Sequence, residues 1–425
     1  MTSKRILITG LSTYWGGRLA QALEQDPAVE AVIGVDKRPP KVALERTEFV
    51  RVEDHHSLIR RIVQAAEIDT VVDTRLVADS IVTSPRLAHE NNVIGTMNVL
   101  AACSGPDSCV RKVVFKSSAR YYGSEQDDPA FFTEAMRRPR PARTMIERDV
   151  VEAESAVREF AERNPETTVT TLRFANGLGP AVHTSYTRYL GLAAIPTILG
   201  FDPRHQFLHE DDIAGVLEHA VRHDLDGVYN AAADGVLVLS EIIDLLGKVG
   251  LPVLPPFATA LALPALKRAR LPISADMLQH LRFGRGLDNR RLKATGYRYR
   301  YTTRETILKL RQHQRISPLT RGMRDGYRYE EEVEEFLRRS PSVRRVAAPR
   351  EPRANLAAGE GPAATSSPRA PTGYADLHAK EVIALLASLE PDALEALREH
   401  EASHASRKTV LAAMDALLSR QRAAI

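Results

Sequence analysis

The first 118 residues alternate short apolar runs with segments of helical period, and this alternation constrains the fold more than any other feature of the sequence. The apolar runs read RILITG, AVIGVD, EFVRVE, DTVVDT and VRKVVFKSS. Strands that alternate with helices in this way form a parallel sheet with crossover helices. Two further strand-like runs, TTVTTLRF and GVYNAA, extend the series. We therefore expect an α/β protein with a doubly wound parallel sheet, over which residues 176–226 and 234–310 lie as loops and helices.

The composition changes after this region. Residues 311–337 continue as a helical extension, and residues 338–372 are rich in Pro, Ala, Gly, Ser and Arg without an apolar period. Such a composition is typical of a flexible, disordered linker. Residues 373–425 then carry three helix-length segments with apolar positions for a small shared core. A helical module of about 50 residues is marginal on its own, so we expect a homodimer contact or a protein partner through 373–425.

Charge and hydropathy exclude several classes of protein. The 58 Lys and Arg residues and the 54 Asp and Glu residues are mixed along most of the chain, which argues against nucleic acid as a partner. The start, MTSKRILITG, lacks the apolar core of a signal peptide. The most apolar later stretch, 251–266, has four prolines in 16 residues and is too short for a membrane span. Cys103 and Cys109 have no His cluster nearby, so we expect reduced thiols, no metal site and a cytoplasmic protein.

A glycine-rich turn follows the first strand. Gly10 ends that strand and Gly16-Gly17 open the next helix, a spacing that lets a pyrophosphate approach the helix N-terminus. The second strand ends in Asp36, whose carboxylate can accept hydrogen bonds from an adenosine ribose. A carboxylate repels the 2′-phosphate of NADP, so NAD is favoured as the cofactor, although Lys37 and Arg38 weaken this preference. The alternative reading is that Asp36 caps the turn before Pro39.

Several motifs follow in order along residues 4–310. They are Thr9-Gly10-x-x-Thr13-x-x-Gly16, NNVIGT at 91–96, FKSSARYYG at 115–123, LRFANGLGP at 172–180 and FLHEDDIA at 207–214. Together they resemble the motifs of the extended short-chain dehydrogenase/reductases, in particular the NAD-dependent epimerase/dehydratase family to which UDP-glucose 4-epimerases belong. The resemblance implies a Rossmann-type sheet, a smaller C-terminal substrate lobe built mainly from 176–226 and 234–310, and a nucleotide-sugar substrate.

The same resemblance assigns roles to individual residues. It implies cofactor contacts from the glycine turn, the ends of the second and third strands and the NNVIGT segment: Gly10, Thr13, Gly16, Asp36, Glu53, Asp54 and Asn92. Thr13 stands where the family has its middle glycine. Ser118 falls on the family's catalytic serine, and the implied substrate contacts are Tyr122, Asn176 and Arg285.

The sequence departs from the family at the expected proton-transfer pair. The family's tyrosine and lysine, four residues apart on one helix, correspond here to Ile146 and Val150. With Ala153 and Val157 these residues form an apolar stripe suited to packing. A second departure is Asp73-Thr74-Arg75-Leu76, where the family has small residues beneath the cofactor.

A third departure is His205, near the position of a family arginine that binds the substrate diphosphate, for which Arg204 or Arg285 could substitute. Glu147 and His183 are further candidates for a replacement base. Two hypotheses follow. The chain is either an NAD-dependent epimerase or dehydratase with an atypical site, or a catalytically inactive nucleotide-binding protein whose C-terminal helices recruit a partner.

Overall fold

A computed structural model describes residues 3–52, 56–79, 83–105, 108–254 and 273–324, together with the single positions 398, 402, 410, 411, 414 and 415. The chain divides into two compact units, Met1–Tyr329 and Glu330–Ile425. The first unit contains the sheet and all of the motifs discussed above.

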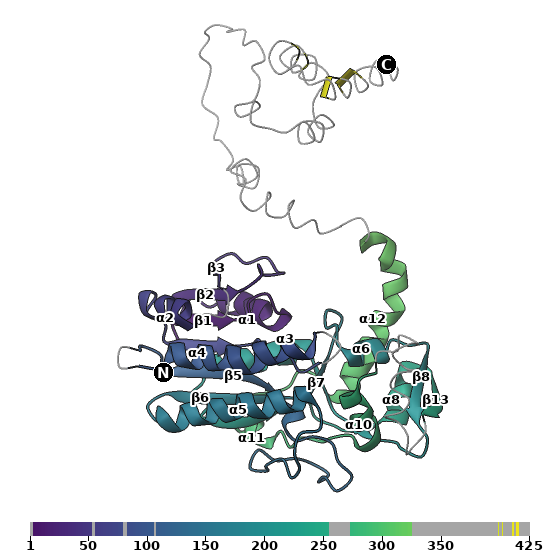
Figure 1. Ribbon diagram of the computed structural model, residues 1–425. Helices are drawn as coiled ribbons and strands as arrows, with labels where there is room; N and C mark the ends of the chain where they lie inside the picture. The colour runs from purple at the N-terminus through teal and green to yellow at the C-terminus, as the bar shows by residue number, and fades with distance from the viewer. Residues whose placement is uncertain are drawn as a thin grey trace. The chain divides into compact units, whose positions relative to one another are not determined.

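Seven parallel strands form the central sheet in the order β11-β6-β5-β4-β1-β2-β3 (Figure 1). They are β1 (Arg5–Thr9), β2 (Ala31–Asp36), β3 (Glu48–Arg51), β4 (Thr70–Asp73), β5 (Lys112–Ser118), β6 (Thr168–Phe174) and β11 (Gly227–Ala231). Each strand coincides with one of the apolar runs, and every pairing between neighbours is parallel. The predicted doubly wound sheet is therefore confirmed.

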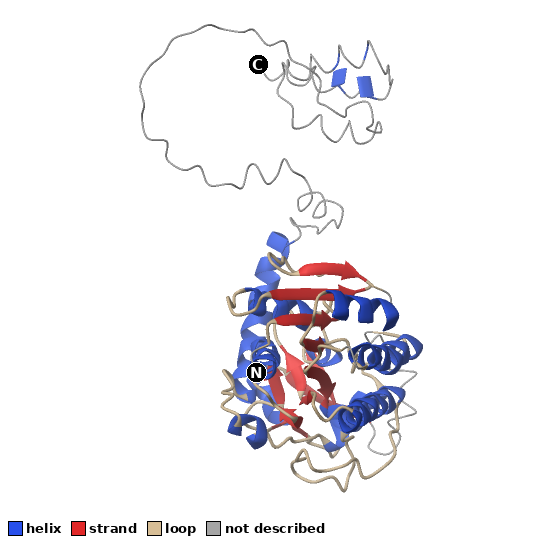
Figure 2. Ribbon diagram, turned by 90° about the vertical axis from the view of Figure 1, so that its left-hand side faces the viewer, coloured by secondary structure: helices blue, strands red, loops and turns tan. Residues whose placement is uncertain are grey.

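Helices cover both faces of the sheet (Figure 2). Residues of α2 (His56–Ala65), α4 (Gly95–Cys103) and α5 (Met145–Arg163) share one apolar core, while α1 (Tyr14–Glu24) and α7 (Glu210–Arg222) contribute to a second. Alternate residues of β1 explain the two cores, because Leu7 packs into the first and Ile6 and Ile8 into the second. The short helices α3 (Pro85–His89), η1 (Glu90–Ile94) and η2 (Ala119–Tyr121) complete this part.

The region after β6 builds a smaller lobe with its own apolar core. Three two-stranded sheets lie in it: β7 (Asn176–Leu178) with β10 (Phe207–His209), β8 (Ala194–Ile198) with β13 (Val249–Leu254), and β9 (Arg204–His205) with β12 (Leu237–Val238). The helices are α6 (Ser185–Tyr189), α8 (Leu239–Leu246), α10 (Ala275–Phe283), α11 (Arg290–Ala294) and α12 (Thr303–Arg324). The sequence predicts loops and helices here, and it does not predict these short strands. Helix α12 also runs without a break across the domain boundary expected at 310.

Little of the second unit is described. Val410 and Met414 are fully buried, and Arg398 Nε lies 2.5 Å from Asp415 Oδ1. The expected linker and most of the expected helical module lie outside the described residues. In the described part of the chain, none of the helices combines the length and apolar character that crossing a bilayer requires.

Candidate functional site

A cavity of about 380 Å³ lies at the carboxyl ends of β1, β4, β5 and β6. This is where an open parallel sheet binds its ligands. The lining residues are 12–15, Arg38, Lys41, 74–79, 116–118, Arg120, 174–177, 184–186 and Ile213. The cavity therefore joins the glycine turn, the end of the serine strand and the start of the lobe.

The glycine turn has the close backbone approach expected of a pyrophosphate site. Gly10 has φ +83°, and a Cβ on Gly16 would lie only 2.3 Å from the Gly10 carbonyl oxygen. The hydroxyl of Thr13 donates to that carbonyl at 2.7 Å and accepts from Gly16 N at 3.0 Å, so Thr13 is the N-cap of α1. Tyr14 and Trp15 are the first two residues of the helix, where amides lack intrahelical acceptors and can bind an anion.

Asp36 holds the glycine turn from the end of β2. Its Oδ2 accepts hydrogen bonds from the backbone N of Ser12 at 2.9 Å and from the Ser12 hydroxyl at 2.7 Å. Its Oδ1 accepts from Lys37 N at 2.7 Å. The carboxylate thus fixes the loop next to the cavity, and its contact with a ribose stays a prediction. Glu53 and Asp54 lie outside the described residues.

Asn92 contacts the backbone of a loop that lines the cavity. The side chain is fully buried, its Oδ1 accepts from Val77 N at 2.8 Å, and its Nδ2 donates to Val77 O at 2.7 Å. Val77 belongs to the loop after β4 that lines the cavity. Asn92 is therefore placed to fix this wall rather than to line the cavity itself.

Arg75 forms a buried ion pair with Asp73 at the end of β4. Arg75 Nη2 lies 2.9 Å from Asp73 Oδ2 and Arg75 Nε lies 3.0 Å from Oδ1. Burial alone would raise the pKa of Asp73, but the guanidinium of Arg75 outweighs this and holds the pKa below its usual value. A Cβ added to Gly95 would meet Arg75 Nη1 at 2.6 Å. Arg75 therefore packs against glycine backbone and has its charge neutralised by Asp73.

Ser118 lies at the carboxyl end of β5 and lines the cavity. Its hydroxyl accepts a hydrogen bond from Arg120 N at 3.3 Å. Tyr122, four residues on, is fully buried and is not among the lining residues. Its hydroxyl donates to Asn230 Oδ1 at 2.9 Å and accepts from Arg173 Nη1 at 2.8 Å. The structure thus gives Tyr122 a place in the core, while Ser118 faces the site.

The stripe on α5 is buried as its sequence indicates. Ile146 is 3% exposed and Val150 is 0% exposed, and Val150 belongs to the core beneath the sheet. Neither side chain can transfer a proton. The candidate replacement Glu147 is held by Arg138, with 2.7 Å between Nη2 and Oε2, and does not line the cavity. His183 lines a different cavity.

The lobe supplies Asn176 to the cavity but not Arg285. Asn176 Nδ2 lies 3.4 Å from His280 Nδ1, which is also 2.5 Å from the hydroxyl of Tyr186, another lining residue. Arg285 instead donates from Nε to Gly123 O at 2.6 Å and from Nη2 to Ser124 Oγ at 3.0 Å. Burial lowers the pKa of Arg285 to about 10. His205 is also buried, and burial lowers its pKa to about 4.

Lys116 is a cavity residue to which the sequence analysis assigned no role. It precedes Ser118 by two residues on β5, lines the same cavity and is buried. Burial lowers the pKa of its amine to about 8. The signal was a lysine that follows the apolar residues VVF of this strand and directly precedes the two serines of the motif.

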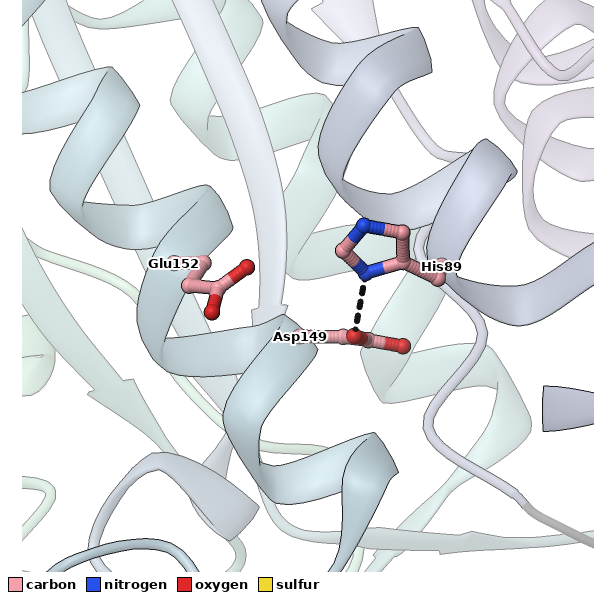
Figure 3. Close-up of side chains that lie close together, drawn as sticks. All are labelled: His89, Asp149 and Glu152. Carbon is pink, nitrogen blue, oxygen red and sulfur yellow. Dashed lines mark hydrogen bonds and ion pairs between the residues drawn. The ribbon is translucent and has the colours of Figure 1, made fainter. Parts of the chain in front are cut away.

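His89, Asp149 and Glu152 place three possible metal-ligand atoms within 4.8 Å of one another, on α3 and α5 (Figure 3). His89 Nδ1 lies 2.8 Å from Asp149 Oδ1, the distance of a hydrogen-bonded ion pair. The hydrogen bond to Asp149 raises the pKa of His89 above its usual 6.5. We interpret the cluster as an ion pair between the two helices.

This pair predicts a pH effect. Because the pKa of His89 is raised in the folded state, its contribution to stability is present below pH 6.5 and is lost as the pH rises through the raised pKa. The imidazole resonances of His89, followed by NMR, should titrate above 6.5, and Asp149→Asn should move the midpoint down. A midpoint unchanged in Asp149→Asn would contradict the pairing.

A doubly wound sheet with a glycine turn at the end of its first strand and a ligand cavity above it defines a dinucleotide-binding protein. The family model described as "NAD dependent epimerase/dehydratase family" matches residues 6–232. The chain belongs to this family, as its motifs predicted.

Curated relatives extend the match beyond the family model. An uncharacterized protein of Mycobacterium tuberculosis and one of Mycobacterium bovis are each 37% identical to the chain over 312 residues, which is 72% of this chain and 82% of the relative. These relatives therefore share the lobe as well as the sheet.

Solved structures share the fold at low sequence identity. UDP-glucose 4-epimerase from Thermotoga maritima, solved with UDP-glucose, is 18% identical, with a TM-score of 0.57 over 74% of this chain and 99% of that one. The dTDP-glucose 4,6-dehydratase from Bacillus anthracis, solved with NAD, is 18% identical, with a TM-score of 0.54 over 74% and 97%. MoeE5, solved with UDP-glucose and NAD, is 19% identical, with a TM-score of 0.55 over 74% and 99%.

Proposed function

We propose that this protein binds NAD and a nucleotide sugar in the cavity and acts as a cytoplasmic NAD-dependent epimerase or dehydratase without the usual tyrosine and lysine pair. The observation that carries the proposal is that one cavity joins the residues of both subsites. Thr13 of the glycine turn, Ser118 of β5 and Asn176 of β7 all line it. Membership of an NAD-dependent family supports the cofactor, and neighbours of the same fold were solved with NAD and UDP-glucose.

The residues present fit a dinucleotide. The Gly10 and Gly16 backbones approach each other so closely that a side chain on either would collide with its neighbours. The first amides of α1 and the adjacent Thr13 would hold the pyrophosphate, and Asp36 would meet the ribose. NAD would supply the hydride acceptor for a substrate C–H bond. Ser118 would donate or accept a hydrogen bond at the substrate oxygen.

A second candidate function rests on the burial of Ile146 and Val150. A protein that kept the cavity but lost proton transfer would be a nucleotide-binding regulatory or scaffold protein, with residues 373–425 recruiting a partner. The two functions differ in one measurement. NMR of UDP-glucose, UDP-galactose or dTDP-glucose incubated with the protein and NAD should show sugar conversion for the enzyme and binding alone for the regulator.

Asp36→Ala is expected to weaken NAD binding by about 10- to 100-fold, because a hydrogen bond to a charged group contributes about 1.5–3 kcal/mol. Titration calorimetry with NAD measures this. Asp127→Ala is the matched control, since Asp127 is an exposed carboxylate paired with Arg140 and does not line the cavity. Wild-type protein that binds no NAD at millimolar concentration would refute the proposed function.

A further inference from the structure

We propose that the amine of Lys116 is the catalytic base of this protein, accepting the proton of the substrate hydroxyl that the family's helix tyrosine would otherwise take. The inference rests on the proposed function and adds to it the residue that moves the proton. Lys116 lies on a strand rather than on the helix that carries the usual pair. The replacement would therefore come from a different wall of the site.

The geometry of β5 places Lys116 beside the catalytic serine position. Side chains two residues apart on a strand point to the same face. Lys116 and Ser118 are two apart, and both line the cavity. A substrate hydroxyl hydrogen-bonded to Ser118 would thus lie on the wall from which the Lys116 amine extends.

A comparison within the same strand shows that Lys116 is not held as a structural cation. Lys112 Nζ lies 3.0 Å from Val221 O, 3.1 Å from His223 O and 2.8 Å from Asp224 Oδ1, which satisfies all three ammonium donors. Lys116 Nζ has one contact in the described part of the chain, Leu76 O at 3.5 Å. An ammonium with three donors and one distant acceptor is costly to bury, whereas a neutral amine is less so.

The nearby carboxylate does not hold the Lys116 amine in its charged form. The carboxylate that acts on Lys116 is Asp73, which favours the charged amine but is already bound by Arg75, Thr9 and Thr96. Burial is the larger effect and lowers the pKa of Lys116 to about 8. Other charged or titratable side chains of the cavity wall are Tyr14, Arg38, Lys41, Arg75, Asp79, Arg120 and Tyr186.

The proposed step conserves atoms and electrons. The O–H bond of a sugar secondary alcohol breaks and its proton passes to the neutral Lys116 amine, giving an ammonium. The carbinol C–H bond breaks with its electron pair as hydride passes to NAD⁺, giving NADH and a ketone. The reverse step returns the proton from the ammonium. A base with a pKa near the working pH performs both directions efficiently.

The first experiment measures proton transfer. Protein, NAD⁺ and UDP-glucose are mixed, and bound NADH is followed by its absorbance in single turnovers across pH. In wild type the rate should rise as the pH approaches about 8 and then level off. Lys116→Met should reduce the rate by about 10²- to 10⁴-fold. Lys116→Arg, which keeps the charge but does not release its proton in this range, should be equally slow.

The matched control is Lys248→Met. Lys248 is half-buried, burial lowers its pKa as it does for Lys116, and it lines a different cavity. Its replacement should leave the rate within about twofold of wild type. Calorimetry should show that Lys116→Met still binds NAD⁺ and UDP-glucose with unchanged affinity, which separates proton transfer from binding.

A second readout does not depend on turnover. A lysine whose folded pKa is about 8 against 10.5 in the unfolded chain destabilises the protein at lower pH, and stability should rise between these two values. The melting temperature of wild type relative to Lys116→Met should therefore increase from pH 8 to 10.5. At neutral pH, Lys116→Met should melt no lower than wild type, because methionine fills the same volume without an unsatisfied amine.

The outcomes distinguish this inference from the proposed function. If wild type binds no NAD, both fail. If wild type binds NAD and UDP-glucose but forms no NADH, or if Lys116→Met forms NADH at the wild-type rate, the base assignment is overturned while the ligand assignment stands. Slow NADH formation in both Lys116 variants, with binding and the Lys248→Met control intact, establishes Lys116 as the base.

Discussion

Replacing Ile146 by Tyr and Val150 by Lys, which restores the family's pair on α5, is expected to lower the free energy of unfolding by about 3–5 kcal/mol. Both positions are at most 3% exposed, so the tyrosine overpacks a filled core and the lysine buries an amine without a partner. Urea denaturation measures the loss. The double variant should reduce NAD with a UDP-sugar no faster than wild type does, because neither position lines the cavity.

The control for this variant lies on the same helix. Met145→Tyr with Arg148→Lys places similar side chains at exposed positions and should change stability by less than about 0.5 kcal/mol. A double variant as stable as wild type and active in hydride transfer would show that this face of α5 opens toward the substrate. The regulatory alternative would then gain support, since the site would be complete except for two side chains.

Breaking the buried pair of Glu154 and Arg173 is expected to cost about 3–5 kcal/mol, because removing one partner leaves an uncompensated charge in the core. Arg173 reaches Glu154 with Nη2 at 2.6 Å and Nε at 3.0 Å, and both side chains are 5% exposed. The guanidinium also lies 3.6 Å from the centre of the Tyr121 ring. Arg173→Met should show the full loss in urea denaturation.

Two comparisons sharpen this second prediction. Glu154→Leu combined with Arg173→Met removes both charges and should recover part of the lost stability. Arg163→Met breaks an exposed pair with Glu159, whose side chains are 76% and 57% exposed, and should cost no more than about 0.5 kcal/mol. A loss below about 1 kcal/mol in Arg173→Met would mean that water reaches the Glu154 carboxylate.

The sheet could be predicted from sequence because its signal is local and repeated. Each of the seven strands is an apolar run bounded by a turn or a helical period, and the parallel order follows from the crossover helices. The two-stranded sheets of the lobe could not be predicted in this way. Strands such as β9 and β12 have two residues each, too few to show any alternation, and their pairing depends on contacts between distant segments.

The sequence could predict only those residues of the candidate site that belong to a short motif. Gly10, Gly16, Ser118 and Asn176 each belong to a short, ordered motif, and the structure places all four at or beside one cavity. Tyr122 belongs to such a motif too, yet its hydroxyl bonds to Asn230 and Arg173 on two other strands, which no local pattern reports.

Lys116 posed the opposite problem. Its sequence neighbours indicate a buried strand, and its proposed role as the base depends on how few acceptors its amine contacts in the described part of the chain. The carboxylate that acts on it, Asp73, is bound by Arg75 from the end of β4. The surroundings of the Lys116 amine depend on side chains from other strands as well as β5, so they cannot be predicted from the sequence of β5 alone.

The hydrogen bonds of Asp36 set a limit on how a ribose can be held. A carboxylate offers about two lone pairs on each oxygen. Both lone pairs of Oδ2 are taken by Ser12, and one of those on Oδ1 is taken by Lys37 N. Among the contacts of the described residues one acceptor position stays open, so one ribose hydroxyl could bind there and a second would displace a group that now donates to Asp36. A ribose held through both of its hydroxyls would therefore replace one hydrogen bond of the glycine turn with its own, and the turn would be less tightly fixed in the bound state.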